Sequence, residues 1–200
     1  MDQLRAWLLN RRNSFGDERL PWYEWFVIEL GLNTGLRVAE MTDLVCGDIQ
    51  FRKELSRVIV RHGKGDKYRE VNINRSFQNS VQEFLEWKRR VGQPTNPESP
   101  LLLSYKTGRK YVPRALQVAF KRCLKGAGIT SHHSIHSTRH SYASLLYKSS
   151  NFNLRLVQKQ LGHSSPVTTQ VYANVFAPEI EKAVENLFSQ NSNTSPPNGL

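Results

Sequence analysis

Apolar side chains recur at helical spacing along most of this chain. Leu4, Trp7 and Leu8 share one side of a short helix expected over residues 2–10. The run that follows Pro21, W-Y-E-W-F-V-I-E-L-G-L, is apolar on nearly every side, which predicts a helix buried in the core and opened by that proline. Its aromatic rings are also suited to stacking on bases, but aromatics in an apolar helical run are more often core residues.

Between Asp48 and Ile73 the pattern becomes that of β-strands. Three segments, I-Q-F, S-R-V-I-V-R and Y-R-E-V-N-I, alternate with polar turns. The tip before the third segment, H-G-K-G-D-K, holds Lys64 between two glycines, and a lysine in such a place is usually only a solvated charge. The fold class is therefore predicted to be mainly α with a small antiparallel β-sheet (α+β).

Further helices are predicted from amphipathic patterns at residues 76–91 and 113–125. Ser134 is a favourable N-cap for a later helix that carries His136 and Arg139 in its first turn. The residues expected to anchor this helix in the core are Tyr142, Leu145 and Leu146. The segment N-L-R-L-V-Q-K-Q-L then forms a helix that Gly162 closes.

Composition indicates one globular domain with a polyanionic partner. The 200 residues are 38% hydrophobic and 10% aromatic, which suits a packed core, and 28 Lys and Arg against 17 Asp and Glu give a net charge of +11. No apolar run approaches the roughly 18 residues of a spanning helix, and the N-terminus lacks the pattern of a signal peptide. Nucleic acid is therefore favoured over a membrane surface, and a cytoplasmic location, associated with the nucleoid when bound to DNA, is expected.

Neither the cysteines nor the histidines favour a metal site. Cys46 and Cys123 are far apart and belong to no C-x-x-C pair, so a disulfide scaffold and a zinc site are both disfavoured. Several histidines lie four residues apart, but no carboxylate or cysteine is nearby to complete a ligand shell, and Arg139 would add positive charge. These histidines are His132, His133, His136 and His140. We expect no metal and no cofactor.

The residues best suited to chemistry lie between His136 and Tyr172. His136 and Arg139 are three apart and share a helix face, so both can point at one small anion. Gly162 then presents His163 at a turn, and the next segment carries Tyr172. Each of these residues alone is usually structural, so the argument depends on the combination. Together they suit a phosphate under attack by a phenol oxygen.

A second anion-binding position is predicted where Gly35 breaks the core helix. Arg37 is expected in the first turn of the next helix, where free backbone N–H groups favour an anion. The alternative is a surface arginine paired with Glu40 at i+3. The two can coexist, because Glu40 can hold Arg37 in place.

Five separated motifs, taken in order, resemble those of the tyrosine recombinases, or phage-type integrases. They are T-G-L-R-V-A-E-M-T-D-L at 34–44, G-K-G-D-K-Y-R at 63–69, H-S-T-R-H, L-G-H and the final tyrosine. The resemblance covers about the whole catalytic domain of that family and implies its fold. The catalytic set that it implies is Arg37, Lys64, His136, Arg139, His163 and Tyr172. Two departures, Thr138 in place of the more frequent leucine and Gly47 in place of an aromatic, are interpreted as packing positions.

The resemblance implies an enzyme that cleaves and rejoins DNA through a covalent 3′-phosphotyrosyl intermediate, without metal or ATP, in the integration or excision of a mobile element. Tyr172 would be the nucleophile. Further DNA contacts are expected from Lys67, Arg69, Arg114 and Lys121. The expected partners are double-stranded DNA, three further protomers in a tetramer on two DNA sites, and accessory DNA-bending or directionality proteins.

The resemblance also implies a domain organisation. Residues 1–188 are expected to form the catalytic domain and residues 189–200 a loose polar tail. Because Arg37 lies near the start of the chain, the family's N-terminal core-binding domain is expected to be absent from it. An apolar stripe of Ile180, Val184 and Leu187 can pack on its own domain or on a neighbour.

Two other functions share parts of this pattern. A type IB topoisomerase has similar chemistry but rejoins the same strand, and the small size and the L-G-H motif favour the recombinase. A non-catalytic DNA-binding module that retains the fold would need the positive charge but not Tyr172.

Overall fold

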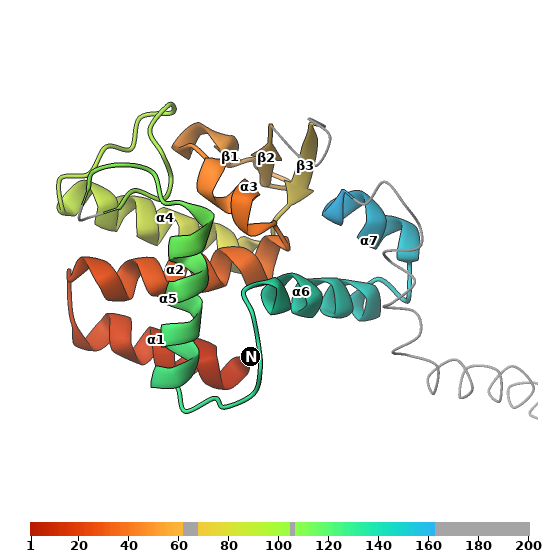
Figure 1. The fold of residues 1–200 in the computed structure, drawn as a ribbon. Coiled ribbons are helices and arrows are strands. Elements are labelled where there is room, and N and C mark those ends of the chain that lie inside the picture. Colours follow the sequence, from red (N-terminus) through yellow and green to blue (C-terminus); the bar gives the residue numbers. More distant parts are fainter. Residues whose placement is uncertain (62–67, 105–106, 163–200) are drawn as a thin grey trace, which may run out of the picture. The chain divides into compact units, whose positions relative to one another are not determined.

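The computed structural model describes residues 1–61, 68–104 and 107–162 (Figure 1). The helices are α1 (Asp2–Ser14), α2 (Arg19–Thr34), α3 (Val38–Asp43), the 3-10 turn η1 (Cys46–Asp48), α4 (Arg75–Arg90), α5 (Pro113–Gly126), α6 (His136–Ser149) and α7 (Leu154–Leu161). The strands are β1 (Ile49–Gln50), β2 (Arg57–Val60) and β3 (Arg69–Asn72). The predicted class, mainly helical with a small antiparallel sheet, is confirmed. The predicted C-terminal apolar stripe and tail lie outside the described residues.

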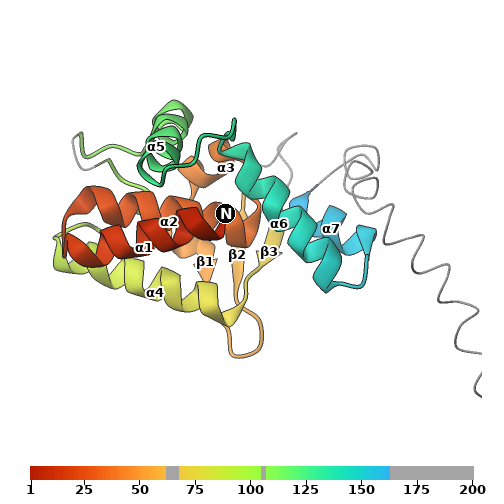
Figure 2. The ribbon, with the colours of Figure 1, turned by 90° about the horizontal axis from the view of Figure 1, so that it is seen from below.

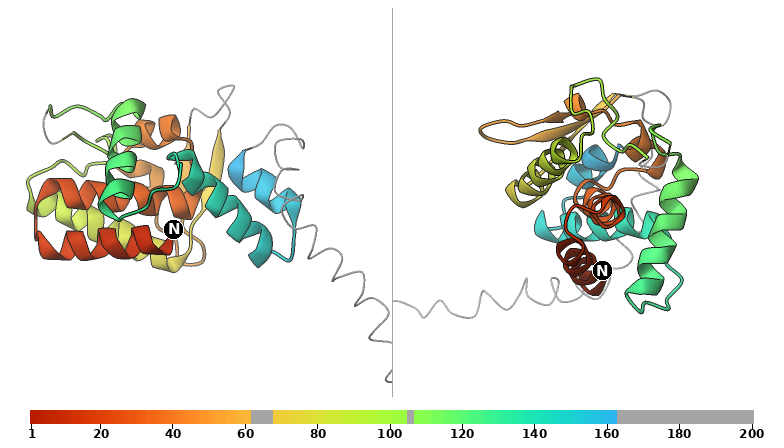
Figure 3. Two further views of the ribbon diagram at one scale, coloured as in Figure 1. Left: turned by 60° about the horizontal axis from the view of Figure 1, so that its bottom comes forward. Right: turned by 90° about the vertical axis from the view of Figure 1, so that its left-hand side faces the viewer.

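Helix α2 is the centre of the core. Every residue from Pro21 to Leu32 is buried, as the all-round apolar pattern predicts. Figures 2 and 3 show α1, α4 and α5 around it, and α6 packs against its C-terminal half. Its rings stack on those of α4, with 3.8 Å between the centroids of Phe26 and Phe84. None of the helices within the described ranges is long and apolar enough to span a bilayer.

The first two helices differ from their predicted bounds. Helix α1 continues to Ser14 instead of ending near residue 10, and Pro21 is the third residue of α2 instead of the first. Proline is tolerated there because the N–H groups of a first helical turn have no acceptor within the helix. The extension of α1 is explained by Arg12, whose guanidinium carbon lies 4.7 Å from the ring centroid of Trp22 and 4.2 Å from that of Trp25.

The three predicted strand segments form one sheet in the order β1-β2-β3. Both pairs are antiparallel, and Val58 faces Val71 in the register of β2 and β3. Asp48 ties the sheet to η1, because its carboxylate accepts a hydrogen bond of 2.9 Å from the Val45 N–H and one of 2.6 Å from Arg61 Nε. Arg61 directly precedes the segment 62–67, so this ion pair fixes the chain where it enters the predicted lysine-bearing tip.

The start of α6 was predicted incorrectly. Its N-cap is Ile135, and no side chain caps the helix, whereas the sequence predicts Ser134 as the cap. Ile135 is buried and belongs to the hydrophobic core, so packing determines where this helix begins.

The buried face of α6 also differs in part from the prediction. Leu145 is 64% exposed, while Ala143 and Tyr147 are buried and Tyr142 and Leu146 are half-buried. The contact with α2 is made by Thr138, in the first turn of α6, and Leu145 lies two turns beyond this contact. The prediction for Leu145 was therefore wrong.

Both positions that depart from the family pattern are packing positions, as interpreted. Thr138 is buried against Gly31 of α2, where an added Cβ would lie 2.5 Å from Thr138 Oγ1. Gly47 lies under Pro97, whose carbonyl oxygen accepts its N–H at 2.9 Å, and an added Cβ would lie 2.9 Å from Pro97 Cβ. Close approach of two segments therefore requires a glycine on one side of each contact.

We predict that Gly31→Ala lowers the free energy of unfolding by about 1–3 kcal/mol, because the new methyl group overlaps Thr138. Helix propensity alone would favour alanine by about 1 kcal/mol, so a net loss identifies the overlap. Urea denaturation measures the change. In the double variant Gly31→Ala/Thr138→Ala part of the loss should be recovered, and strictly additive losses would contradict this account.

Candidate active site

The predicted catalytic residues divide into two groups. Arg37, His136 and Arg139 lie in the described part of the chain, whereas Lys64, His163 and Tyr172 lie outside it, as does the predicted DNA contact Lys67. The described group can be examined directly. His163 follows immediately after Gly162, the last described residue, so the surroundings of Gly162 bear on it as well.

Arg37 is held by Glu40. It is the N-cap of α3 rather than a residue of the first turn, and its backbone N–H donates to Glu40 Oε2 at 2.7 Å. Its Nη1 donates to Glu40 Oε1 at 2.8 Å, so the predicted i+3 ion pair is confirmed. Within residues 1–61, 68–104 and 107–162 this is the only hydrogen bond that the Arg37 guanidinium makes. A guanidinium carries five N–H donors, so the described pair with Glu40 uses only one of them.

Glu40 binds a second arginine from the sheet. Arg69, the first residue of β3, donates from Nη1 and Nη2 to the two oxygens of Glu40, each at 2.8 Å. The side chains are 10% and 4% exposed, respectively. Burial raises the pKa of Glu40, but the hydrogen bonds and charges of Arg69 and Arg37 outweigh it and hold that pKa below its ordinary value. The structure thus places the guanidinium of Arg69, a predicted DNA contact, on a buried carboxylate.

Arg139 joins the ends of two helices. It is buried in α6, and its Nη1 donates to the Gly35 carbonyl oxygen at 2.5 Å while Nη2 donates to the Leu161 carbonyl oxygen at 2.9 Å. These are the C-terminal ends of α2 and α7. Gly35 is two residues before Arg37, so Arg139 binds the turn of the chain that leads into Arg37.

The end of α7 is built as the sequence predicts, with Gly162 in the left-handed region at φ 64°. An added Cβ there would lie 2.6 Å from Arg69 Cδ, so the side chain of Arg69 passes directly across this glycine. Arg69 and Arg139 therefore contact neighbouring residues, Gly162 and Leu161, at the same helix terminus. The sequence pattern did not indicate this double contact.

Tyr142 is a neighbour of these arginines. It was predicted as a core residue, and it packs on Gly35, where an added Cβ would lie 2.4 Å from Tyr142 Cδ1. Burial raises its pKa to about 12, although the charges of Arg139 and Arg69 act in the opposite direction. The raised pKa means that this phenol loses its proton less readily than an ordinary tyrosine.

The other predicted residues are exposed. His136 is the first residue of α6, three positions before Arg139 as predicted, and faces solvent. Arg114 and Lys121 are exposed on α5 and, being seven positions apart, lie on one side of that helix.

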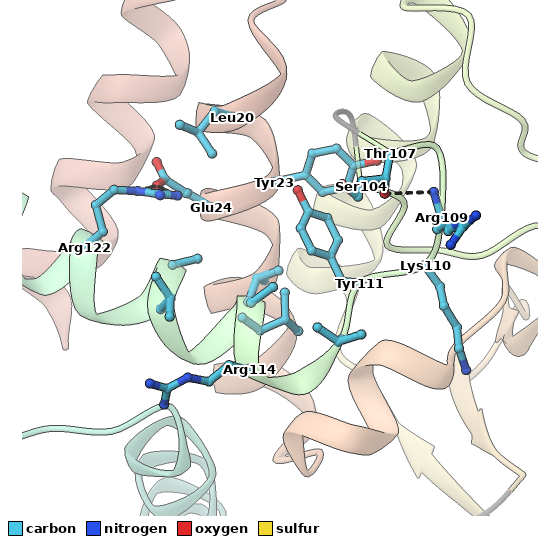
Figure 4. A pocket seen from close by; sticks show the side chains of 16 residues that line it. Leu20, Tyr23, Glu24, Ser104, Thr107, Arg109, Lys110, Tyr111, Arg114 and Arg122 are labelled. Atoms are coloured by element: carbon cyan, nitrogen blue, oxygen red, sulfur yellow. Dashed lines mark hydrogen bonds and ion pairs between the residues drawn. The ribbon is translucent and has the colours of Figure 1, made fainter.

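A cleft of about 610 Å³ lies between α2, α5 and the segment before α5 (Figure 4). Tyr23 and Tyr111 line it, and the Arg122–Glu24 ion pair closes one end. Arg37, His136 and Arg139 are not among its lining residues. The cleft is therefore separate from the site formed by Arg37, Glu40, Arg69 and Arg139.

Comparison with known proteins agrees with this architecture. The model of the phage integrase family matches residues 7–179, and the chain belongs to that family. It is 36% identical over 160 residues to the tyrosine recombinase XerC of Vibrio parahaemolyticus serotype O3:K6, covering 80% of this chain and 49% of the relative. It is 33% identical over 169 residues to XerC of Caldanaerobacter subterraneus subsp. tengcongensis, covering 84% and 46%.

Solved structures of recombinases have the same fold as this chain. A post-cleavage complex of the XerH site-specific recombinase with palindromic difH substrate matches with a TM-score of 0.71 and 25% identity, over 92% of this chain and 51% of that one. The XerA recombinase has the same fold at a TM-score of 0.70 and 22% identity, over 98% and 64%. The predicted recombinase fold is confirmed. The chain spans about half the length of the XerC relatives.

We predict that Glu40→Gln costs about 3 kcal/mol of stability at pH 7, because it leaves two guanidinium groups without their carboxylate. Since the pKa of Glu40 is lowered by folding, its contribution is present above its ordinary value near 4.5 and is lost as the pH falls through the folded-state value. Urea denaturation between pH 7 and pH 3 should show the difference between variant and wild type shrinking in acid. Glu54→Gln, at an exposed site, should stay within about 0.5 kcal/mol.

Proposed function

We propose that this chain cleaves and rejoins DNA strands in site-specific recombination, with Tyr172 as the nucleophile and without metal or ATP. The observation that carries the proposal is the hydrogen bond from Arg139 to the Gly35 carbonyl, two residues before Arg37, in a chain of the phage integrase family. A phosphodiester repels nucleophiles by its negative charge. In a site without metal, fixed cations around the non-bridging oxygens neutralise this charge and stabilise the transition state.

Arg37 and Arg139 bind the non-bridging oxygens in this proposal. The two guanidinium groups are held in different ways. Arg37 is held by the carboxylate of Glu40, whereas Arg139 is held by two backbone carbonyls. Preorganised donors of this kind favour the transition state, since they need no rearrangement as charge develops. His163 adds a hydrogen bond to the same oxygens.

Proton transfer accompanies the attack. Tyr172 loses its phenolic proton to His136, and its oxygen forms a bond to phosphorus as the bond to the 5′ oxygen breaks. Lys64 donates a proton to that departing oxygen. The products are a 3′-phosphotyrosyl DNA and a free 5′-hydroxyl. The ester conserves the bond energy, so a 5′-hydroxyl of another strand can attack it, release Tyr172 and rejoin the DNA.

The full reaction requires two double-stranded sites and, in our proposal, four protomers. The recombinases XerH and lambda integrase have been solved on their DNA substrates, and this chain shares their fold. Integration, excision or inversion then depends on where the two sites lie. Integration or excision of a mobile element is the outcome that we propose, with accessory DNA-bending or directionality proteins as further partners.

We predict that the protein forms a denaturation-resistant adduct with nicked or bridging-phosphorothiolate duplexes in EDTA, because the leaving group cannot reverse the cleavage. Candidate duplexes are drawn from the target sites of Xer-type relatives and from a randomised pool. Gel electrophoresis under denaturing conditions measures the adduct. Tyr172→Phe should abolish it.

The matched control is Tyr142→Phe, which removes a phenol close to the same arginines and should leave the adduct intact. Loss of the adduct in both variants, or in neither, would contradict the role of Tyr172. DNA binding without any adduct would favour a non-catalytic module.

We predict further that Arg114→Ala and Lys121→Ala each weaken DNA binding and lower the slope of log affinity against log salt concentration by about one. Both side chains are exposed on the same side of α5. Fluorescence anisotropy at several salt concentrations measures both quantities. The control is Glu86→Ala, an exposed position on α4, which should increase affinity slightly or not at all. Equal slopes for all proteins would contradict the assignment.

A further inference from the structure

We propose that Arg69 is a positioning residue for strand cleavage, rather than a contact to DNA. The inference rests on the proposed function. Arg69 fixes two separate parts of the site, namely Arg37 through Glu40 and the end of α7 that precedes His163. It belongs to β3, the strand that follows the predicted Lys64 tip, so it also joins that strand to the other two parts.

The first part of the argument concerns Glu40. Its Oε1 accepts hydrogen bonds from both Arg37 Nη1 and Arg69 Nη1, and its Oε2 accepts from the Arg37 backbone N–H and from Arg69 Nη2. The end-on fork of Arg69 fixes the plane of the carboxylate. That plane in turn determines the direction in which Arg37 is held. A lysine at position 69 supplies charge but not a fork.

The second part concerns α7. The Cδ and Nε atoms of Arg69 lie against Gly162, at 2.6 and 2.9 Å from the position of an added Cβ. A neighbouring hydrogen bond, from the Asn72 N–H to Gln160 Oε1 at 3.0 Å, joins the same strand to the same helix. Arg69 thus acts as a spacer that determines how closely the last turn of α7 approaches β3.

The buried Nε of Arg69 has no hydrogen-bond partner among the residues that the structure describes. Leaving a buried donor unpaired is costly, so contacts at the two ends of the side chain must determine its orientation. The guanidinium is directed at Glu40 and is 10% exposed. Turning it to a phosphate would leave the Glu40 carboxylate with Arg37 alone.

The experiment compares Arg69→Lys and Arg69→Gln with matched changes at Arg57. Arg57 is an arginine of the adjacent strand β2 that also pairs with a glutamate, Glu70, but does not contact Glu40. The 200-residue chain is used throughout. Single-turnover adduct formation at saturating suicide duplex gives the rate of the chemical step, and anisotropy gives the DNA dissociation constant and its salt dependence.

We expect both Arg69 variants to lower the single-turnover rate by about 100-fold, the scale of a misplacement near 1 Å, with an unchanged dissociation constant and salt slope. The Arg57 variants should keep the wild-type rate. A weaker affinity with a salt slope reduced by about one and an unchanged rate at saturation would identify a phosphate contact and overturn the proposal. A rate restored by Arg69→Lys would overturn it as well, because charge alone would then suffice.

A second measurement does not need activity. Hydrogen exchange of the free protein follows the Arg37 amide, which donates to Glu40, and the Gly162 amide, which donates to the Lys159 carbonyl. Both should exchange about 10-fold faster in the Arg69 variants and not in the Arg57 variants. If the wild type forms no adduct, the proposed function fails and this measurement alone decides the positioning role. Unchanged exchange at both amides would overturn it.

Discussion

A buried carboxylate shared by two guanidinium groups is the interaction on which the described site depends. Glu40 accepts from Arg37 and Arg69 and is almost inaccessible to solvent. A buried charge is tolerated only when it is paired and hydrogen-bonded, so neither arginine can leave without a large penalty. Three elements, α3, β3 and the turn after α2, are consequently fixed relative to one another by one side chain.

Helix α2 supplies the frame for this arrangement. Because this helix is buried on all sides, its C-terminal end is fixed in the core, and other segments form hydrogen bonds to it. Arg139 of α6 donates to the Gly35 carbonyl and to the Leu161 carbonyl of α7, and Gly31 lets α6 approach α2 closely enough for these bonds. A change in the packing of α6 on α2 therefore also changes the position of Arg139.

The sequence predicts those features that depend on local pattern. The helix of residues 19–34, the three strands and the Gly162 stop follow from apolar spacing and from glycine. The Arg37–Glu40 pair follows from i+3 spacing. Features set by distant contacts were missed. Leu145 is exposed although it follows the apolar pattern of α6, and Arg69 is expected from the sequence to contact DNA because nothing near it in sequence reveals Glu40.

The hydrogen bond between Arg139 and Gly35 spans 104 residues, and that between Arg69 and Glu40 spans 29. Chains begin to fold from the N-terminus while they are being synthesised. On the ribosome, α2 and the sheet can therefore assemble, and Glu40 can find both of its arginines, well before α6 and α7 emerge. The joining of the two helix ends comes last. A growing chain thus carries a folded core for some time before its arginines are brought together, and a truncated translation product ending before α6 would have the core without the completed site.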